Sequence, residues 1–376
     1  MKDEVFLMKK TKTYLKNFVG TSYEVGTRIG NWILSEPNLL KKIILPSNAY
    51  PQSKLKEIFN LLDRYCSGVN EEIEGFVDTV GISKEQAIFY AMTYLERGCS
   101  LMSAVPNKIE NGHTLMARNY DFNDEMEEMC FAYTAIRGKY RYIGSTLNLF
   151  GRCDGMNEYG LAACKASNGL PVGNFEGGQK AGITGFSFWV VIRSILENCK
   201  NVEEAIAWAM DAPIGYNINL MLADNSNKIA LLQCIDGHKS YRILDNESKQ
   251  KFLISTNHTV LPEIKPYEKM LIENSVIRYK AIEKMFCEKE KISEKDLKDI
   301  LSTSYPKGLC CHYYPEFFGT LRSMVFNTTE KKIEMTFGSP QANEWKTFMV
   351  EKLQEQEIIV NLPCEKAGKD FYNIMP

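Results

Sequence analysis

The residue pair Gly98-Cys99 stands where the sequence changes from a helical to a strand-like pattern. A thiol is nucleophilic only as its thiolate, so a reactive cysteine needs a base or a cation beside it. Cleavage of the Gly98–Cys99 bond would supply that base, because Cys99 would gain a free α-amino group within reach of its own thiol. Such an amine has a pKa of about 7.7–8.0, so no catalytic histidine is required. In the alternative, purely structural interpretation, Gly98 is a helix cap and Cys99 is the first buried residue of a strand.

Two charged residues, Arg118 and Asp121, follow Cys99 in a predicted β-hairpin. The segments CSLMSAVP and TLMARNYDF read as strands joined by an Asn-Gly turn. Pairing them matches residues whose numbers sum to about 219 or 220, which puts Tyr120 or Asp121 across from Cys99. Arg118 is three positions from Asp121, so a regular strand points it to the other face. Both would reach Cys99 only if the strand ends or bulges near Asn119.

Helical patterns precede the junction and strands follow it. Apolar spacing predicts helices over 52–97, and the capping box Ser83-Lys-Glu-Gln86 predicts that the last one runs to about Arg97. Consecutive strands broken by blocks of helix predict an α+β fold with mostly antiparallel sheets. Further strands are predicted at 131–137, 140–150, 159–165, 320–327 and 331–337 and in YNINLMLAD, KIALLQCID, KSYRILD and KFLISTNH, with helices at 185–199, 202–210, 266–288 and 293–302.

Five segments, in order, resemble the cysteine N-terminal-nucleophile hydrolase family, which contains bile salt hydrolases, penicillin V acylases and acyl-coenzyme A:6-aminopenicillanate acyltransferases. They are ERGCS (96–100), ARNYDF (117–122), DGMNEYGLA (154–162), STNH (255–258) and GLCCHYYPEFFGTLRSMVF (308–326). The last segment, and YEVGTRIG at 23–30, resemble the acyltransferase branch. The resemblance implies a four-layer αββα sandwich. It also implies a helical pro-segment, residues 1–98, and a catalytic domain, residues 99–376. Self-cleavage cuts the covalent link between them, and the pro-segment stays associated with the catalytic domain.

The same resemblance assigns roles residue by residue. Cys99 matches the nucleophile, and Arg118 and Asp121 match an Arg-x-x-Asp pair beside it. Asn257 matches an asparagine whose side-chain amide helps to form the oxyanion hole, where one donor lowers the barrier by about 3 kcal/mol. Without the resemblance, Asn257 reads as a turn residue that ends a strand.

Two family positions are matched less closely. Arg278, in NSVIRYK, lies nearest to a further family arginine, with the register off by about one residue. Its alternative reading is a solvated helix position, and Arg322 is the other candidate. The second oxyanion donor of the bile salt branch, an asparagine or tyrosine, falls on Ser167, followed by Asn168. A bile-salt-like specificity is therefore not expected.

Other chemistries have weaker support. Cys310, Cys311 and His312 could suggest zinc, but the sequence offers no C-x-x-C partner to complete a tetrahedral site, so no metal or other cofactor is expected. A papain-like enzyme would place its cysteine at a helix N-terminus, whereas Cys99 follows a helix. No phosphate-binding glycine motif is present, which leaves nucleotide binding unsupported.

Composition limits the partners and the compartment. A net charge of −2 offers no basic field for nucleic acid, and no stretch reaches the apolar length of a membrane span. Eleven cysteines in a chain whose start lacks a signal-like apolar run favour reduced thiols in the cytoplasm. The oligomeric state stays open, a homo-oligomer included.

The function that we expect is therefore hydrolysis of a linear, non-peptide amide by an autoproteolytically activated cysteine enzyme. The substrate would be a small acyl amide or acyl thioester, which forms an S-acyl intermediate on Cys99. One alternative is an acyltransferase that moves the acyl group to an acceptor amine. A non-enzyme alternative is an unprocessed homologue that serves as a binding protein.

Overall fold

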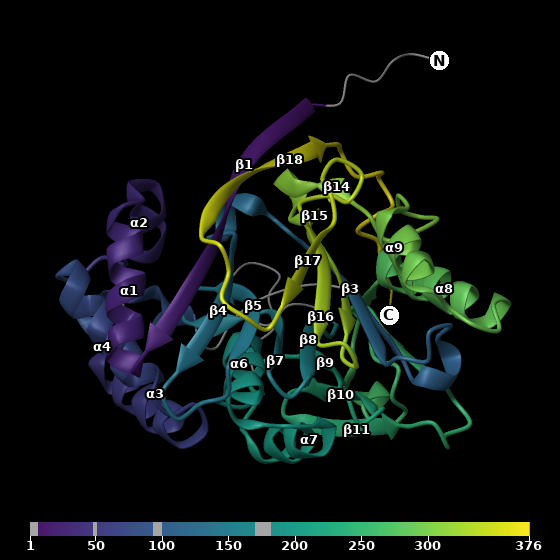
Figure 1. Cartoon of the computed structure of the whole chain (residues 1–376), viewed down its shortest axis with the longest axis horizontal. Coiled ribbons are helices and arrows are strands. Elements are labelled where there is room, and N and C mark those ends of the chain that lie inside the picture. Colours follow the sequence, from purple (N-terminus) through teal and green to yellow (C-terminus); the bar gives the residue numbers. More distant parts are fainter. Residues whose placement is uncertain (1–6, 48–50, 93–99, 170–181, 376) are drawn as a thin grey trace.

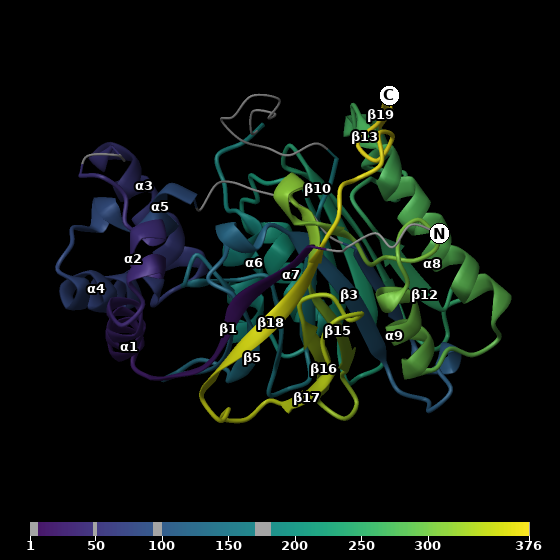
Figure 2. The ribbon, with the colours of Figure 1, turned by 90° about the horizontal axis from the view of Figure 1, so that it is seen from above.

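The computed structural model describes residues 7–47, 51–92, 100–169 and 182–375. Two large β-sheets pack face to face, and helices cover both outer faces (Figures 1 and 2). This arrangement is the predicted four-layer αββα sandwich of the α+β class.

The first sheet has ten strands, and the only parallel pair that the described residues form in it is β1 with β4. The N-terminal strand β1 lies between β4 and β18, so the two ends of the chain pair side by side within this sheet. In sheet order the strands are β11 (His238–Leu244), β10 (Ile229–Ile235), β9 (Ile218–Ala223), β8 (Ala162–Ser167), β7 (Asp154–Asn157), β5 (Tyr142–Leu147), β4 (Cys130–Ile136), β1 (Leu7–Gly20) and β18 (Gln356–Cys364), with β6 (Gly151–Arg152) beside β5.

The second sheet has seven strands and contains the predicted hairpin at its centre. Ser100 of β2 pairs with Asn119 of β3, and Leu101 pairs with Arg118, so the pair numbers sum to 219. The predicted register is therefore confirmed. In sheet order the strands are β12 (Phe252–Ser255), β2 (Ser100–Ala104), β3 (Leu115–Phe122), β15 (Phe318–Asn327), β16 (Lys332–Phe337) and β17 (Lys346–Met349), with β14 (His312–Tyr313) beside β15.

Each sheet has its own helical cover. Helices α6 (Phe188–Asn198) and α7 (Val202–Asp211) contact the first sheet, and α8 (Glu273–Glu288) and α9 (Glu294–Ser302) contact the second (Figure 2). The Asn201 side chain caps α7 by accepting a hydrogen bond from the Glu204 backbone N–H at 2.9 Å, as predicted.

The N-terminal segment supplies the predicted helices and, in addition, strand β1. Its helices are α1 (Ser22–Leu34), α2 (Pro37–Ile43), α3 (Gln52–Tyr65), α4 (Val69–Val80) and α5 (Ile88–Met92). Helices α1 and α4 lie so close that a Cβ added at Gly26 would stand 1.7 Å from the Glu72 carbonyl oxygen. Glycine therefore permits this helix contact.

Two predicted helices differ from the structure. The capping box at Ser83 is present, but it begins a 3-10 turn (Lys84–Gln86), and extended Ala87 separates that turn from α5. The continuation to Arg97 lies outside the described residues. The helix predicted from 266 begins at Glu273, because Lys265–Tyr267 is a 3-10 turn around Pro266 and β13 (Leu271–Ile272) pairs with β19 (Ile374–Met375).

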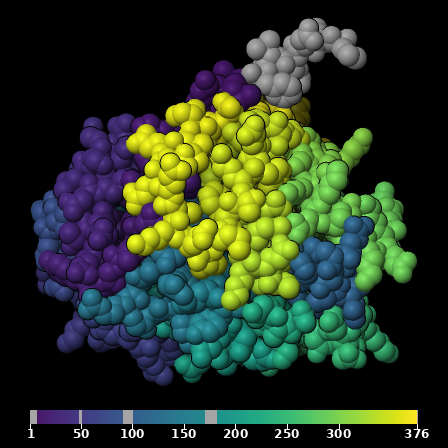
Figure 3. Space-filling model, in the orientation of Figure 1, coloured from purple at the N-terminus to yellow at the C-terminus, as the bar shows by residue number. Residues whose placement is uncertain are grey.

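One large hydrophobic core fills the space between the sheets and continues into the N-terminal helices, and a smaller core lies beneath α8 and α9. In the space-filling view, the C-terminal region (yellow) covers the middle of the face between the N-terminal helices and α8 and α9 (Figure 3). The described cysteines carry free thiols. No helix within the described ranges is long and apolar enough to cross a membrane.

Candidate active site

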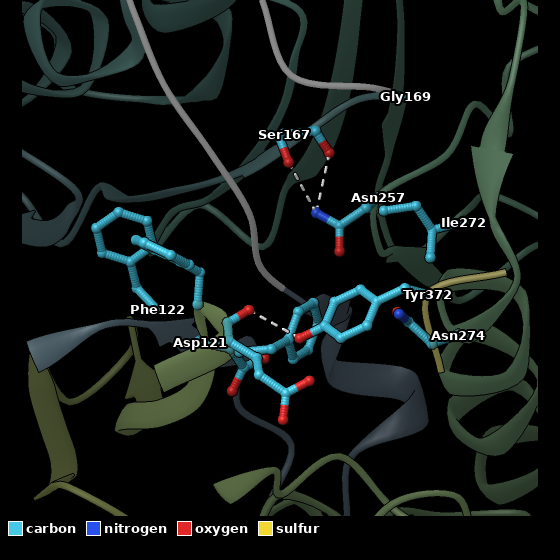
Figure 4. Close-up of a pocket in the computed structure, with 11 residues that line it drawn as sticks. Asp121, Phe122, Ser167, Gly169, Asn257, Ile272, Asn274 and Tyr372 are labelled. Atoms are coloured by element: carbon cyan, nitrogen blue, oxygen red, sulfur yellow. Dashed lines mark hydrogen bonds between the residues drawn. The ribbon is translucent and has the colours of Figure 1, made fainter. Parts of the chain in front are cut away.

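A pocket of about 180 Å³ opens where β3, β8 and β12 end and α8 begins (Figure 4). Its inner part carries buried polar side chains, and its outer part carries mostly aromatic and aliphatic ones. The lining residues are Asp121, Phe122, Ser167, Gly169, Asn257, Ile272, Asn274, Glu316, Phe317, Phe318 and Tyr372. Three of the predicted site residues, Asp121, Asn257 and Ser167, therefore share one cavity.

Cys99 and Gly98 lie outside the described residues, and the described chain resumes at Ser100. Ser100 is fully buried, and its hydroxyl accepts a hydrogen bond from Arg278 Nη1 at 2.5 Å. The residue that follows the predicted nucleophile is thus held by the predicted arginine.

Arg278 connects the polar residues of this region. It projects from α8 and is fully buried, which excludes the reading as a solvated helix position. Its Nη2 donates to Asn257 Oδ1 and to Asn274 Oδ1, each at 2.7 Å. One guanidinium therefore links the start of β2 to Asn257, because its donors form a rigid planar fork.

The Asn257 amide faces Ser167. Its Nδ2 donates to the Ser167 carbonyl oxygen at 3.1 Å and lies 3.0 Å from the Ser167 hydroxyl (Figure 4). The Asn257 backbone N–H donates to Ser275 Oγ at 2.7 Å. The neighbouring His258 is buried close to Arg278 and Lys265, and burial is the main cause that lowers the pKa of its imidazole to about 4. This histidine is therefore neutral at neutral pH.

Asp121 is buried with one carboxylate oxygen engaged. Its Oδ1 accepts a hydrogen bond from the Thr320 hydroxyl at 2.7 Å, and within the described part of the chain Oδ2 has no hydrogen-bond partner. Burial raises the pKa of this carboxyl group, and the nearby charge of Arg278 acts in the opposite direction. Asp121 is thus a desolvated acceptor at the wall of the pocket.

Arg118 lies on the other face of β3. Its Nη1 donates to the Cys153 carbonyl oxygen and to Asp154 Oδ2, both at 2.9 Å, across the interface between the sheets. The strand neither ends nor bulges near Asn119, since β3 continues to Phe122. The irregularity is in β15, where the register shifts between Thr320 and Arg322. Regular alternation along β3 therefore separates Arg118 from Asp121.

The remaining predicted residues lie outside the pocket lining. Arg322 forms a buried ion pair with Glu127 at 2.9 Å, and its guanidinium lies 4.4 Å from the Tyr120 ring centroid. Asn168 is buried, and its Oδ1 accepts a hydrogen bond from Thr259.

His312 belongs to a polar group behind Asp121. Its Nε2 lies 2.8 Å from Ser339 Oγ and 3.4 Å from Cys310 Sγ, and its Nδ1 lies 2.8 Å from Glu365 Oε1. Burial raises the pKa of the Cys310 thiol to about 12. These side chains hold one another, and none of them lines the pocket.

Sequence reasoning missed two residues with prominent contacts. Asn274 bonds Arg278, and its spacing of four residues on a helix was a usable signal. Thr320 holds Asp121 through a strand pairing between residues 199 apart, and no local pattern indicates such a contact.

Comparison with known proteins gives one family match. The family model described as acyl-coenzyme A:6-aminopenicillanic acid acyl-transferase matches residues 108–342. No curated protein sequence matches the chain.

Several solved structures are similar to this one. An N-acylethanolamine-hydrolyzing acid amidase ortholog from Caenorhabditis elegans has 17% identity and a TM-score of 0.44, over 61% of this chain and 93% of its own. Penicillin V acylase from Agrobacterium tumefaciens has 19% identity and a TM-score of 0.44, over 68% and 87%. A variant of conjugated bile acid hydrolase from Clostridium perfringens has 12% identity and a TM-score of 0.42, over 72% and 99%.

The sandwich fold and the family match define an enzyme of the N-terminal-nucleophile type, an amide hydrolase or acyltransferase. Because the family model spans more than half of the sequence, the chain belongs to the acyl-coenzyme A:6-aminopenicillanic acid acyl-transferase family.

Proposed function

We propose that the protein cleaves its own Gly98–Cys99 bond and then hydrolyses linear amides through an S-acyl intermediate on Cys99. The observation that carries this proposal is the hydrogen bond from Arg278 to Ser100 beside the pocket. Ser100 follows Cys99 directly in the sequence, which is why this bond supports the proposal.

Asp121 has the properties needed to hold the new α-amino group. Its second carboxylate oxygen has no hydrogen-bond partner among the described residues, and burial makes a positively charged or donating neighbour favourable. An N–H of the neutral N-terminal amine, or of the ammonium that it becomes, would satisfy that oxygen. Asp121 would then orient the amine that takes the thiol proton, as the base does in other activated nucleophiles.

Asn257 and Ser167 are suited to stabilise the oxyanion. The Asn257 amide carries two N–H donors, and its oxygen is fixed by Arg278 at 2.7 Å. The Ser167 hydroxyl, 3.0 Å from that amide, can rotate to donate as well. Because Asn257 Nδ2 here donates to the Ser167 carbonyl oxygen and hydroxyl, the carbonyl oxygen of the substrate would replace one of these acceptors, and the Ser167 hydroxyl would be the second donor.

The reaction then follows in balanced steps. The Cys99 thiol gives its proton to the Cys99 amine, and the resulting thiolate attacks the amide carbonyl carbon. The carbon–nitrogen bond breaks, and the leaving amine takes that proton, which leaves an S-acyl enzyme. Water then attacks the thioester to release the acid and restore the thiol. If an acceptor amine attacks in place of water, the product is a new amide and the enzyme is an acyltransferase.

The choice between hydrolysis and transfer can be measured directly. The family match favours a test for transfer, because the matching family is described by an acyl-transferase activity. An acyl amide incubated with and without 6-aminopenicillanic acid would give the new amide only in a transferase. The acyl donor would be an amide or a thioester such as acyl-coenzyme A.

Self-cleavage should be visible in the purified protein. A cut after residue 98 would divide the 43.0-kDa chain, in proportion to length, into pieces of about 11 and about 32 kDa. Intact-mass analysis should find both pieces, and the larger one should begin at Cys99. A preparation that stays one chain and still hydrolyses amides would contradict internal cleavage.

We also propose that residues 1–98 stay bound after cleavage. Strand β1 pairs with β4 on one side and with β18 on the other, so its removal would split the first sheet. Helix α4 contributes Glu72, which forms a bidentate ion pair with Arg193 of α6 at 2.6 and 3.0 Å. Both side chains are 1% exposed, so separation of the pieces would leave the Glu72 carboxylate without its cation, whereas Arg193 would keep its ion pair with Glu197 at 2.8 Å.

The exchange of Glu72 for Gln should therefore weaken the association of the two pieces. Loss of one partner of a buried ion pair costs about 3–5 kcal/mol when the other charge is left alone. Because Arg193 keeps Glu197, we expect a smaller effect, about tenfold or more in the dissociation constant. Release of the 11-kDa piece on size-exclusion chromatography should need less urea in Glu72→Gln than in the wild type.

The matched control is Glu57→Gln in the same segment. Glu57 pairs with Lys54 at 3.4 Å on the surface, where an ion pair contributes about 0–1 kcal/mol. This variant should release the piece at the wild-type urea concentration. Equal behaviour of the two variants would show that the buried pair does not hold the pieces together.

We place the enzyme in the cytoplasm, because eleven cysteines are most readily kept as free thiols in a reducing compartment.

A further inference from the structure

Residues 365–375, which we call the strap, run from the end of β18 across the proposed substrate pocket. The strap contacts β14 and the turn that follows it. Glu365 lies 2.8 Å from His312, and the Ala367 backbone N–H donates to Glu316 Oε1 at 3.0 Å. Residues that follow the last large strand thus form part of the site.

Phe371 anchors the strap in an aromatic cage. Its ring lies 4.9 Å, centroid to centroid, from each of the rings of Tyr305, Tyr313 and Phe318, in edge-to-face geometry. The Phe371 side chain is 3% exposed. Edge-to-face packing of this kind fixes a ring in position as well as burying it.

The strap is also bonded to the residues that hold the proposed catalytic centre. The Phe371 carbonyl oxygen accepts a hydrogen bond from Asn274 Nδ2 at 2.8 Å, and Asn274 Oδ1 accepts one from Arg278 at 2.7 Å. The pairing of β19, at the end of the strap, with β13 also attaches the strap to the segment that precedes α8. The position of the strap is therefore set by the same helix, α8, that carries Arg278.

Tyr372 lies across the pocket between its two walls. Its backbone belongs to the strap, and its hydroxyl donates to the Glu316 carbonyl oxygen on the opposite wall at 2.8 Å (Figure 4). Tyr372 is 37% exposed, whereas Asp121 and Asn257 are 1% and 6% exposed. The ring therefore stands at the outer end of the cavity, and the polar residues stand at the inner end.

We propose that Tyr372 is a specificity-determining residue that closes the outer end of the acyl pocket and limits the acyl group to a compact one. The cavity of about 180 Å³ is close in size to a cavity of about 150 Å³ that holds benzene. The lining residues Phe122, Phe317 and Phe318 suit an apolar acyl group. This inference rests on the proposed function, because it takes the inner end of the pocket as the place of acyl transfer.

The test measures which acyl groups reach Cys99. The wild type, Tyr372→Ala and Tyr372→Trp are treated with p-nitrophenyl esters from acetyl to dodecanoyl, and the S-acyl large chain is followed by intact mass. The wild type should favour short acyl groups and benzoyl. Tyr372→Ala should raise the rate with dodecanoyl, relative to butanoyl, by about tenfold or more, since pockets discriminate single methylenes by about that factor. Tyr372→Trp should shift the preference toward shorter groups.

Tyr241→Ala is the control, because Tyr241 is an exposed tyrosine on the edge strand β11 and does not line the pocket. It should keep the wild-type chain-length profile. The inference would be overturned if processed Tyr372→Ala and Tyr372→Trp both kept that profile. If no ester acylated the processed wild type, the proposed function itself would fall, and the inference with it.

Discussion

Cys99→Ala is expected to remain a single 43.0-kDa chain without amidase activity. The substitution removes the attacking sulfur, so neither self-cleavage nor acyl transfer can begin. Cys99→Ser keeps an attacking oxygen, but a hydroxyl ionises far less readily than a thiol near neutral pH. We therefore expect slow or partial self-cleavage of Cys99→Ser, with little or no amide hydrolysis. Intact mass and a chromogenic amide would measure both effects.

Cys310→Ala and Cys311→Ala are the matched controls for the nucleophile. Burial raises the pKa of the Cys310 thiol to about 12 and that of Cys311 well above its usual range. Both thiols are therefore protonated near neutral pH and should be poor nucleophiles. The two variants should be processed, and iodoacetamide should still label the N-terminal cysteine of the large chain. Normal processing of Cys99→Ala, or amide hydrolysis by it, would show that another residue is the nucleophile.

The parts of the fold that depend on local sequence were predictable. The register of β2 with β3 follows from the Asn-Gly turn and the alternation of the strands, and the structure confirms it. Strand β1 was missed because its N-terminal half is polar and largely exposed, and because its partners lie far away in the sequence. The pairing of β13 with β19 joins residues about 100 positions apart, and no local pattern indicates it.

The candidate site, like the fold, was predictable only in part. The motifs indicated Asp121, Asn257 and Ser167, and the structure places all three in one pocket. Of the residues that hold them, Arg278 was indicated by its motif, whereas Thr320 was not, because it reaches Asp121 only through a tertiary contact. The different environments of Arg118 and Asp121 follow from strand alternation, which the sequence did indicate. A motif thus predicts which residues take part, and the packing of distant segments determines their contacts.

Asn257→Ala should lower kcat by about a hundredfold or more and leave the fold nearly intact. The loss of one oxyanion donor has an effect of about 10²–10³ on kcat, or about 2.7–4 kcal/mol. The substitution also removes the Oδ1 that accepts from Arg278, so part of a measured loss could come from a displaced guanidinium. Two further variants separate these causes.

Asn274→Ala removes a different acceptor of Arg278, one that takes the same 2.7-Å hydrogen bond, and keeps the Asn257 amide. Its loss of kcat should be smaller than that of Asn257→Ala. Asn257→Asp keeps an acceptor for Arg278, but it offers no N–H donor and places a carboxylate where the oxyanion forms. Its kcat should fall at least as far as that of Asn257→Ala. A decrease of less than about threefold in a folded and processed Asn257→Ala would contradict the predicted oxyanion role, because the loss of an oxyanion donor costs far more. Asn257 would then be a residue that only ends β12.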